Sequence, residues 1–226
     1  KPTHDGWPGV RTPCGLCFLQ KWAPLRYAST TALLFTLYTK TFPDDPLADA
    51  LDEWALRTLH YVLGENGEGR SYMIGYSAGS TSAGSAGPAG DYPRRPHHRS
   101  SSCPAASPLD PVCNMSHACS TCASPWVLYG AVVGGPDATD CWNDDRVNWE
   151  RNEVALDYNA PYPGLIAWAL GKQADAAPTS PPPASLPPLV FAQPPGACEG
   201  IPRDAPFSAV CPAGPASKSQ PACPYM

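Results

Sequence analysis

Two consecutive stretches of helical periodicity constrain the fold of this chain more than any other feature. Between Trp22 and about Lys40, apolar residues occur on nearly every helical face, and Pro24 suits the first turn, where a missing N–H costs nothing. Between residues 44 and 64 the apolar residues keep to one stripe, and Asp49 and Asp52 lie on the other face, which we expect to face solvent. The stripe consists of Leu47, Leu51, Trp54, Ala55, Thr58, Leu59 and Val62. A helix that is apolar all round is buried on several sides, so the pair predicts a layered arrangement of inner and outer helices.

The sequence between Gly64 and Ser124 predicts long loops, because Gly, Ser, Ala, Cys and Pro dominate it. Loops of that length inside a compact domain are either functional or disordered. A last helix is expected to end at Leu170, and Pro161 and Pro163 are expected to separate it from a preceding loop.

The end of the chain differs in composition from the rest. Fourteen of the 30 prolines fall in the last 53 residues, which hold few large apolar side chains and so cannot easily offset the entropy of ordering. We therefore predict a domain over residues 1–173, a Pro-rich linker over 174–195, and a Cys- and Pro-containing tail over 196–226.

The charge and hydropathy of the chain exclude two classes of partner. A net charge of −5 argues against nucleic acid, whose binding needs a basic surface. No apolar run reaches the roughly 18–20 residues of a membrane span. The chain starts at Lys1 without a signal-peptide pattern, so we expect processing or a start inside a longer protein. We expect a monomer.

Ten cysteines suggest disulfides and therefore an oxidising, extracellular compartment. The triplet Asn114-Met115-Ser116, a glycosylation acceptor sequence, agrees with secretion. An alternative stays open, because Cys113, His117, Cys119 and Cys122 have the types and spacing of zinc ligands. In that case the chain would be a small zinc-stabilised interaction module.

Ionisable and aromatic residues concentrate in two segments, residues 92–102 and 142–160. Aromatic faces stack on sugar rings, and carboxylates exchange protons with a glycosidic oxygen or water, so this mixture suits carbohydrate chemistry. The alternative is a solvated face in which aspartates such as Asp140 and Asp144 pair with Arg146 and Arg151.

The order of several motifs adds a resemblance. Trp142, Asp144, Trp149, Glu153, Ala155, Asn159 and Ala160 occupy every specified position of a pattern that resembles the second signature of family 9 glycoside hydrolases. The segment Pro96-His97-His98-Arg99 is similar to the family's Pro-His-His-Arg loop, and Trp22-x-x-Leu25-Arg26-Tyr27 is similar to an earlier helix. The resemblance covers about residues 12–170.

The resemblance implies a fold and an activity. The fold would be all-α, the C-terminal portion of an (α/α)6 barrel with long loops, followed by the Pro-rich tail. The family hydrolyses β-1,4-glucan chains, typically cellulose, with inversion at the anomeric carbon, so the chain would belong to an endo-β-1,4-glucanase.

The resemblance also implies roles for particular residues. Glu153 would be the general acid, and His97 would be the active-site histidine. Asp144 would be a further catalytic residue with an orienting role through Arg146 or the sugar. The expected substrate contacts are Arg99, Arg146, Trp149 and Tyr158.

One part of the mechanism has no candidate in this chain. An inverting hydrolase needs a second carboxylate as base, and the only carboxylate before Trp22 is Asp5. We expect the base, and the ligands of the calcium that some relatives bind, to lie upstream of this chain, which itself needs no cofactor. The alternative is a non-catalytic sugar-binding relative that binds through Trp142, Trp149 and Tyr158.

Overall fold

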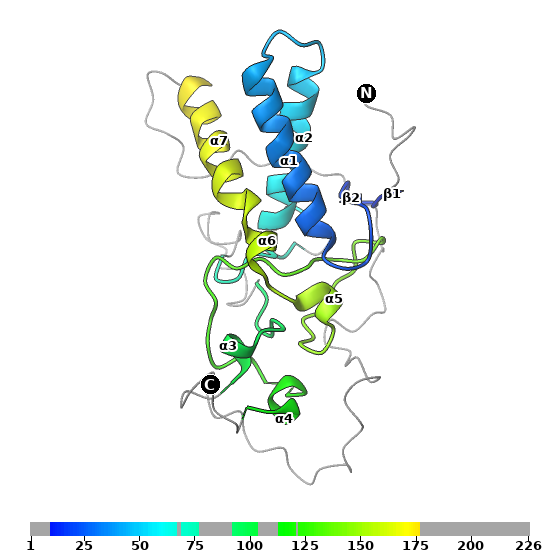
Figure 1. Ribbon diagram of the computed structural model, residues 1–226. Helices are drawn as coiled ribbons and strands as arrows, with labels where there is room; N and C mark the ends of the chain where they lie inside the picture. Colours follow the sequence, from blue (N-terminus) through cyan, green and yellow to red (C-terminus); the bar gives the residue numbers. More distant parts are fainter. Residues whose placement is uncertain (1–9, 67–68, 77–91, 104–112, 121, 177–226) are drawn as a thin grey trace, which may run out of the picture.

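Three long helices form the main layer of the computed structural model, which describes residues 10–66, 69–76, 92–103, 113–120 and 122–176. These helices are α1 (Pro24–Thr41), α2 (Ala48–Leu63) and α7 (Pro161–Ala176), and α1 packs against both of the others (Figure 1). Two short strands, β1 (Val10–Arg11) and β2 (Cys17–Phe18), pair antiparallel beside α1. Four helices of one turn each make up the rest: α3 (Arg99–Ser102), α4 (Met115–Ala118), α5 (Trp149–Asn152) and α6 (Leu156–Asn159). The described part is therefore helical, as predicted.

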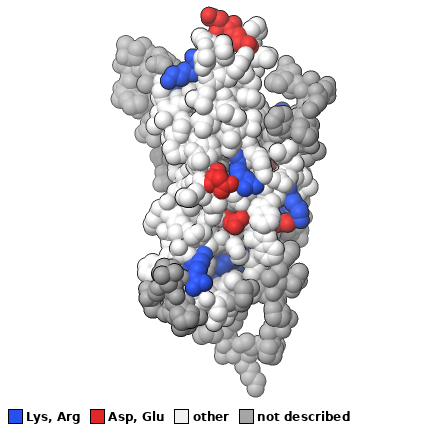
Figure 2. All heavy atoms as spheres, viewed as in Figure 1, with Lys and Arg blue, Asp and Glu red and all other residues white. Residues whose placement is uncertain are grey.

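Helix α1 begins at Pro24, two residues after the predicted start at Trp22, and it is not buried on several sides. Its buried side chains include Leu25, Ala28 and Ala32, which belong to the hydrophobic core. On its other side Leu34 and Leu37 are 58% and 53% exposed, because no element within the described ranges covers them. The upper part of the face in Figure 2 accordingly carries few charged residues.

Helix α2 buries most of the predicted stripe and ends where predicted. Leu59 and Val62 are fully buried, whereas Leu47, before the helix, is exposed. Gly64 ends the helix with a φ of +122°, a conformation that favours glycine. The polar face is not wholly solvated: Asp52 accepts a hydrogen bond from Thr39 and pairs with Lys172, so it joins α2 to α1 and α7.

The prolines near the end of the described chain begin a helix instead of breaking it. Pro161 and Pro163 both lie in the first turn of α7, where backbone N–H groups have no partner inside the helix. Tyr162 is buried and accepts a 2.7 Å hydrogen bond from Ser29 on α1. Helix α7 continues to Ala176, three residues past the predicted end of the domain at 173.

Three isolated β-bridges connect segments that are far apart in the sequence. Met73 pairs with Val132, Val133 pairs with Val154, and His97 pairs with Glu153. Val132 and Val133 are fully buried. The bridge from Met73 to Val132 therefore ties part of the predicted loop region to the hydrophobic core. The bridges place residues 96–99 next to residues 152–154.

Gly134 provides a test of how closely these segments pack. A Cβ atom at Gly134 would lie 2.6 Å from the backbone oxygen of Glu150, which cannot move aside like a side chain. We expect Gly134→Ala to lower the free energy of unfolding by about 1–3 kcal/mol. Gly171→Ala is the matched control, because a Cβ there meets open space within helix α7, and it is expected to raise stability by up to about 1 kcal/mol. Urea unfolding measures both, and equal effects would contradict the packing.

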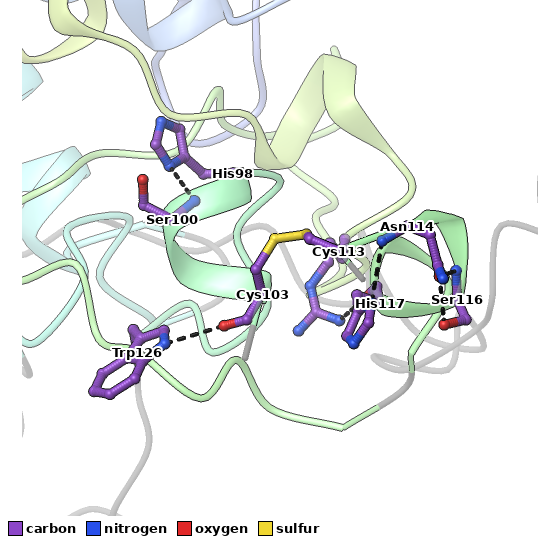
Figure 3. Close-up of a disulfide and its surroundings, with 9 residues drawn as sticks. His98, Ser100, Cys103, Cys113, Asn114, Ser116, His117 and Trp126 are labelled. Carbon is purple, nitrogen blue, oxygen red and sulfur yellow. Dashed lines mark hydrogen bonds between the residues drawn. A yellow bond between two sulfur atoms is a disulfide. The ribbon is translucent and has the colours of Figure 1, made fainter. Parts of the chain in front are cut away.

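A disulfide joins the residue after α3 to a cysteine two residues before α4. Cys103 and Cys113 are bonded, with their Cα atoms 5.4 Å apart (Figure 3). This bond confirms the predicted disulfide chemistry and makes the zinc hypothesis wrong, since the Cys113 sulfur is not free to bind a metal. Within the described ranges no His, Cys, Asp and Glu side chains group as metal ligands would. In the same ranges no helix combines the length and the apolar character that crossing a membrane requires.

Candidate active site

Glu153 is held at a fixed position by its backbone. It is the first residue after α5, its N–H donates to the oxygen of Trp149, and its backbone is extended. Successive side chains in extended backbone point to opposite sides, and the next residue, Val154, is buried in the core and bridged to Val133. The Glu153 side chain therefore points away from the core.

One oxygen of the Glu153 carboxyl accepts two hydrogen bonds. The Tyr158 hydroxyl donates to Oε2 at 2.8 Å, and Nε1 of Trp22 donates to the same oxygen at 3.0 Å. Trp22 Nε1 also lies 3.1 Å from the Tyr158 oxygen. The start of α1 and helix α6 thus meet at the carboxyl, although Trp22 and Glu153 are 131 residues apart.

The pair Arg26 and Asp157 flanks this cluster. Arg26 on α1 binds Asp157 on α6 at 2.9 Å, and its guanidinium lies 5.1 Å from the centre of the Tyr158 ring. Burial raises the pKa of Tyr158, and the hydrogen bond to Glu153 raises it further, so the phenol keeps its proton and acts as a donor. Charged residues gather over this junction of α1 with α5 and α6 in Figure 2.

His97 lies beside Glu153 because its loop pairs with the end of α5. Its backbone N–H donates to the oxygen of Asn152 at 2.7 Å, and its ring lies 6.3 Å from the Trp149 ring. Nδ1 lies 2.7 Å from the carbonyl oxygen of Arg146, which can only accept, so Nδ1 carries a proton. In the neutral ring Nε2 is then the nitrogen that can accept one.

Asp144 holds the backbone just before the histidine loop. The side chain is buried, and its two oxygens accept from the backbone N–H groups of Arg94 and Arg95 at 2.7 and 2.9 Å. Burial raises the pKa of Asp144 despite these donors and the charge of Arg95. The carboxylate thus holds the backbone just before His97, and its expected catalytic role stays a prediction.

Arg146 is also buried against backbone groups, which argues against the expected substrate contact. It is 3% exposed. Its guanidinium donates at 2.8–3.0 Å to the backbone oxygens of His117, Ser120 and Cys122 and to the Ser124 hydroxyl. Burial and the nearby charge of Arg95 lower the pKa of Arg146 to about 10, so it stays charged near neutral pH.

The other expected residues fall into two groups. Trp149 and Tyr158 lie in the cluster around Glu153 and His97, whereas Arg99 is exposed at the start of α3, and its contact with sugar stays a prediction. The solvated-face alternative expected Arg151 to pair with aspartates such as Asp140 or Asp144. Arg151 instead pairs with Asp137 at 3.0 Å. The role of Trp22 was not predicted from the sequence. Its place in the motif before α1 was the available signal.

The surroundings of the Asp137 carboxyl predict that the stability of the fold depends on pH. Burial alone would raise its pKa, but hydrogen bonds from Thr139 and Cys141 and the charge of Arg151 together lower it. Because the folded pKa lies below the unfolded value of about 3.9, the contribution of the carboxylate is complete above that value. It is lost as the pH falls through the folded pKa.

We therefore expect Asp137→Asn to lower the free energy of unfolding by about 1–2 kcal/mol at pH 7, and by progressively less below about pH 4. Denaturant unfolding across pH 3–7 measures the difference. Asp49→Asn, at an exposed position on α2, is the control and should show little effect. A constant difference at every pH would contradict the assignment.

Comparisons with known proteins agree on one family. The family model described as glycosyl hydrolase family 9 matches residues 3–166. Endoglucanase A of Bacillus pumilus is 35% identical over 156 residues, covering 69% of this chain and 20% of that protein. Endoglucanase 5 of Arabidopsis thaliana is 36% identical over 187 residues, covering 74% of this chain and 27% of that protein. The chain thus spans about a fifth to a quarter of these curated relatives.

Solved structures agree with this match. The endoglucanase of the termite Nasutitermes takasagoensis has a TM-score of 0.56 and 34% identity, covering 70% of this chain and 32% of that chain. Endoglucanase CelQ from Clostridium thermocellum, complexed with cellobiose and cellotriose, has a TM-score of 0.56 and 32% identity, covering 80% of this chain and 26% of that chain. With the family model matching most of its length, this chain belongs to glycosyl hydrolase family 9.

Proposed function

We propose that this chain carries the general-acid half of the active site of an endo-β-1,4-glucanase. The reaction is hydrolysis of β-1,4-glucosidic bonds in cellulose or a related glucan, with inversion. The observation that supports it most is the Glu153 carboxyl, which has Oε2 anchored by Trp22 and Tyr158 and Oε1 without a hydrogen bond to any described residue.

The two donors give the two carboxyl oxygens different tasks. Oε2 already accepts from Trp22 and Tyr158, so in the acid form the proton resides on Oε1. A proton at Oε1 can be donated to the leaving glycosidic oxygen as the bond to the anomeric carbon breaks. The carboxylate that results keeps both donors, and hydrogen bonds to a charged acceptor are the stronger kind.

The surroundings of Glu153 supply candidate sugar contacts. The rings of His97 and Trp149 lie together next to Glu153 in the chain's fold, and aromatic rings stack on sugar faces. We propose that these two residues and Arg99 contact the glucan near the cleaved bond.

The base has to come from another part of the protein. An inverting pair of carboxyls lies about 6.5–9.5 Å apart, with a water between them. Asp144 is bound to backbone N–H groups and Asp157 to Arg26, so neither is available to activate that water. We propose that sequence upstream supplies the base, in keeping with the fraction of each relative that the chain spans.

The exposed apolar side of α1 supports a larger fold. Leu34 and Leu37 would be covered if α1, α2 and α7 were the last helices of an (α/α)6 barrel. We propose that architecture for the complete domain. We also propose that the protein is secreted, since the Cys103–Cys113 disulfide needs an oxidising compartment and the glucan polymer is extracellular.

The test is to incubate the complete protein with cellohexaose and follow the products by proton NMR. Initial release of the α-anomer from the β-linked substrate would support inverting hydrolysis. The β-anomer would overturn the inverting mechanism. Binding without cleavage, measured by calorimetry, would instead favour a non-catalytic sugar-binding protein.

A further inference from the structure

We propose that Asn114 is an N-glycosylation site, at which the side-chain nitrogen Nδ2 receives an oligosaccharide from a lipid-diphosphate donor. Asn114-Met115-Ser116 is the one Asn-x-Ser/Thr triplet among the 226 residues. Such triplets also arise by chance, so the structural surroundings of this one carry the argument.

The first and last residues of the triplet are both accessible. Asn114 lies immediately before α4, and the side chains of Asn114 and Ser116 are exposed. Figure 3 shows the two residues close together at the start of this helix, away from Cys103 and Trp126. A bulky sugar on this side of α4 therefore displaces no side chain from the core.

The hydrogen bonds identify which side-chain atom of Asn114 is available. The backbone N–H of Ser116 lies 2.9 Å from Oδ1 of Asn114, and the Ser116 hydroxyl lies 2.7 Å from the same atom. A backbone N–H can only donate, so the atom that it meets is the amide oxygen and the other is Nδ2. Nδ2 has no hydrogen bond to any residue that the structure describes, so it is free to react.

The same hydrogen bonds favour the chemistry. An amide nitrogen is a poor nucleophile because resonance delocalises its electron pair into the carbonyl group. Two donors at Oδ1 draw electron density toward the oxygen and make the N–H protons of Nδ2 more acidic. In the transfer, a bond forms between Nδ2 and the anomeric carbon of the first sugar. The bond from that carbon to the diphosphate oxygen breaks, the lipid diphosphate leaves with the electron pair, and a base of the transferase takes one Nδ2 proton.

The neighbouring disulfide places the chain in a suitable compartment. Cys113 directly precedes Asn114 and is bonded to Cys103. Disulfides form and persist in oxidising compartments such as the lumen of the secretory pathway, where lipid-linked oligosaccharides are also used. A chain that acquires this disulfide in that lumen is exposed to the donor.

The experiment is peptide mapping of the full chain secreted from a eukaryotic host. After treatment with peptide-N-glycosidase in ¹⁸O-labelled water, we expect the peptide containing residue 114 to carry labelled aspartate there, and the untreated protein to be heavier by one glycan. Ser116→Ala should abolish the added mass and Ser116→Thr should retain it. Asn148→Gln, which changes an asparagine outside the triplet, is the control and should leave the mass of the glycan unchanged.

The proposal is overturned if the wild-type peptide is recovered with unmodified Asn114 and no glycosylated form. That result needs no variant to fold. The mass measurement does not depend on glucan hydrolysis. A failure of the glycosylation proposal can therefore be told apart from a failure of the proposed enzymatic function.

Discussion

Glu153→Gln in the complete protein is expected to lower kcat on cellulose by about 10²–10⁴-fold, the range typical of a lost general acid. Glutamine has nearly the same size and keeps an oxygen that can accept from Trp22 and Tyr158, but it has no proton to give to the leaving oxygen. Because the change acts mainly on the transition state, KM should change little. Initial rates of reducing-end release on soluble cellulose measure both constants.

Two controls separate the loss of acid catalysis from a general loss of structure. A dinitrophenyl β-cellobioside has a leaving group that needs no protonation, so Glu153→Gln should hydrolyse it nearly as fast as the wild type. Glu150→Gln makes the same chemical change three residues earlier, where Glu150 pairs with the exposed Lys21 at 2.7 Å, and should retain cellulose hydrolysis. A Glu153→Gln variant with nearly normal activity on cellulose would remove Glu153 as the acid.

Arg146→Met is expected to lower the free energy of unfolding by about 3–5 kcal/mol, among the largest effects of any single change in this chain. Methionine fills part of the space but donates no hydrogen bond, so the partly buried oxygens of His117, Ser120 and Cys122 lose their partner. Two further charges, Asp144 and Asp145, lose a neighbouring cation. Urea unfolding at pH 7 measures the change.

The control for Arg146 is an arginine at the surface. Arg57 forms an ion pair with Glu53 along α2, and both side chains are exposed. Arg57→Met should therefore cost no more than about 1 kcal/mol. If Arg146→Met instead kept full stability and raised KM for cello-oligosaccharides, the original expectation of a substrate contact would be restored.

The local structure was largely predictable because it depends on short-range rules. Pro24 begins α1 and Gly64 ends α2 for reasons that concern only the first and last turns of a helix. The same rules were misapplied at Pro161 and Pro163, where a proline pair marks the first turn of α7 and not a break. Glu153 could be proposed as the acid because a resemblance over many positions supported it.

The sequence by itself indicated the three long helices, through their apolar periodicity, and its resemblance to a known family indicated the candidate acid. Only the tertiary structure decided that Trp22 reaches Glu153, that Asp144 binds the backbone at Arg94 and Arg95, and that the buried Arg146 binds backbone carbonyls. The physical reason is that a charged residue looks the same in the sequence in two different situations. Its side chain can face a sugar, or it can form hydrogen bonds with backbone groups inside the fold. Burial distinguishes the two, and burial depends on segments that lie far apart in the chain.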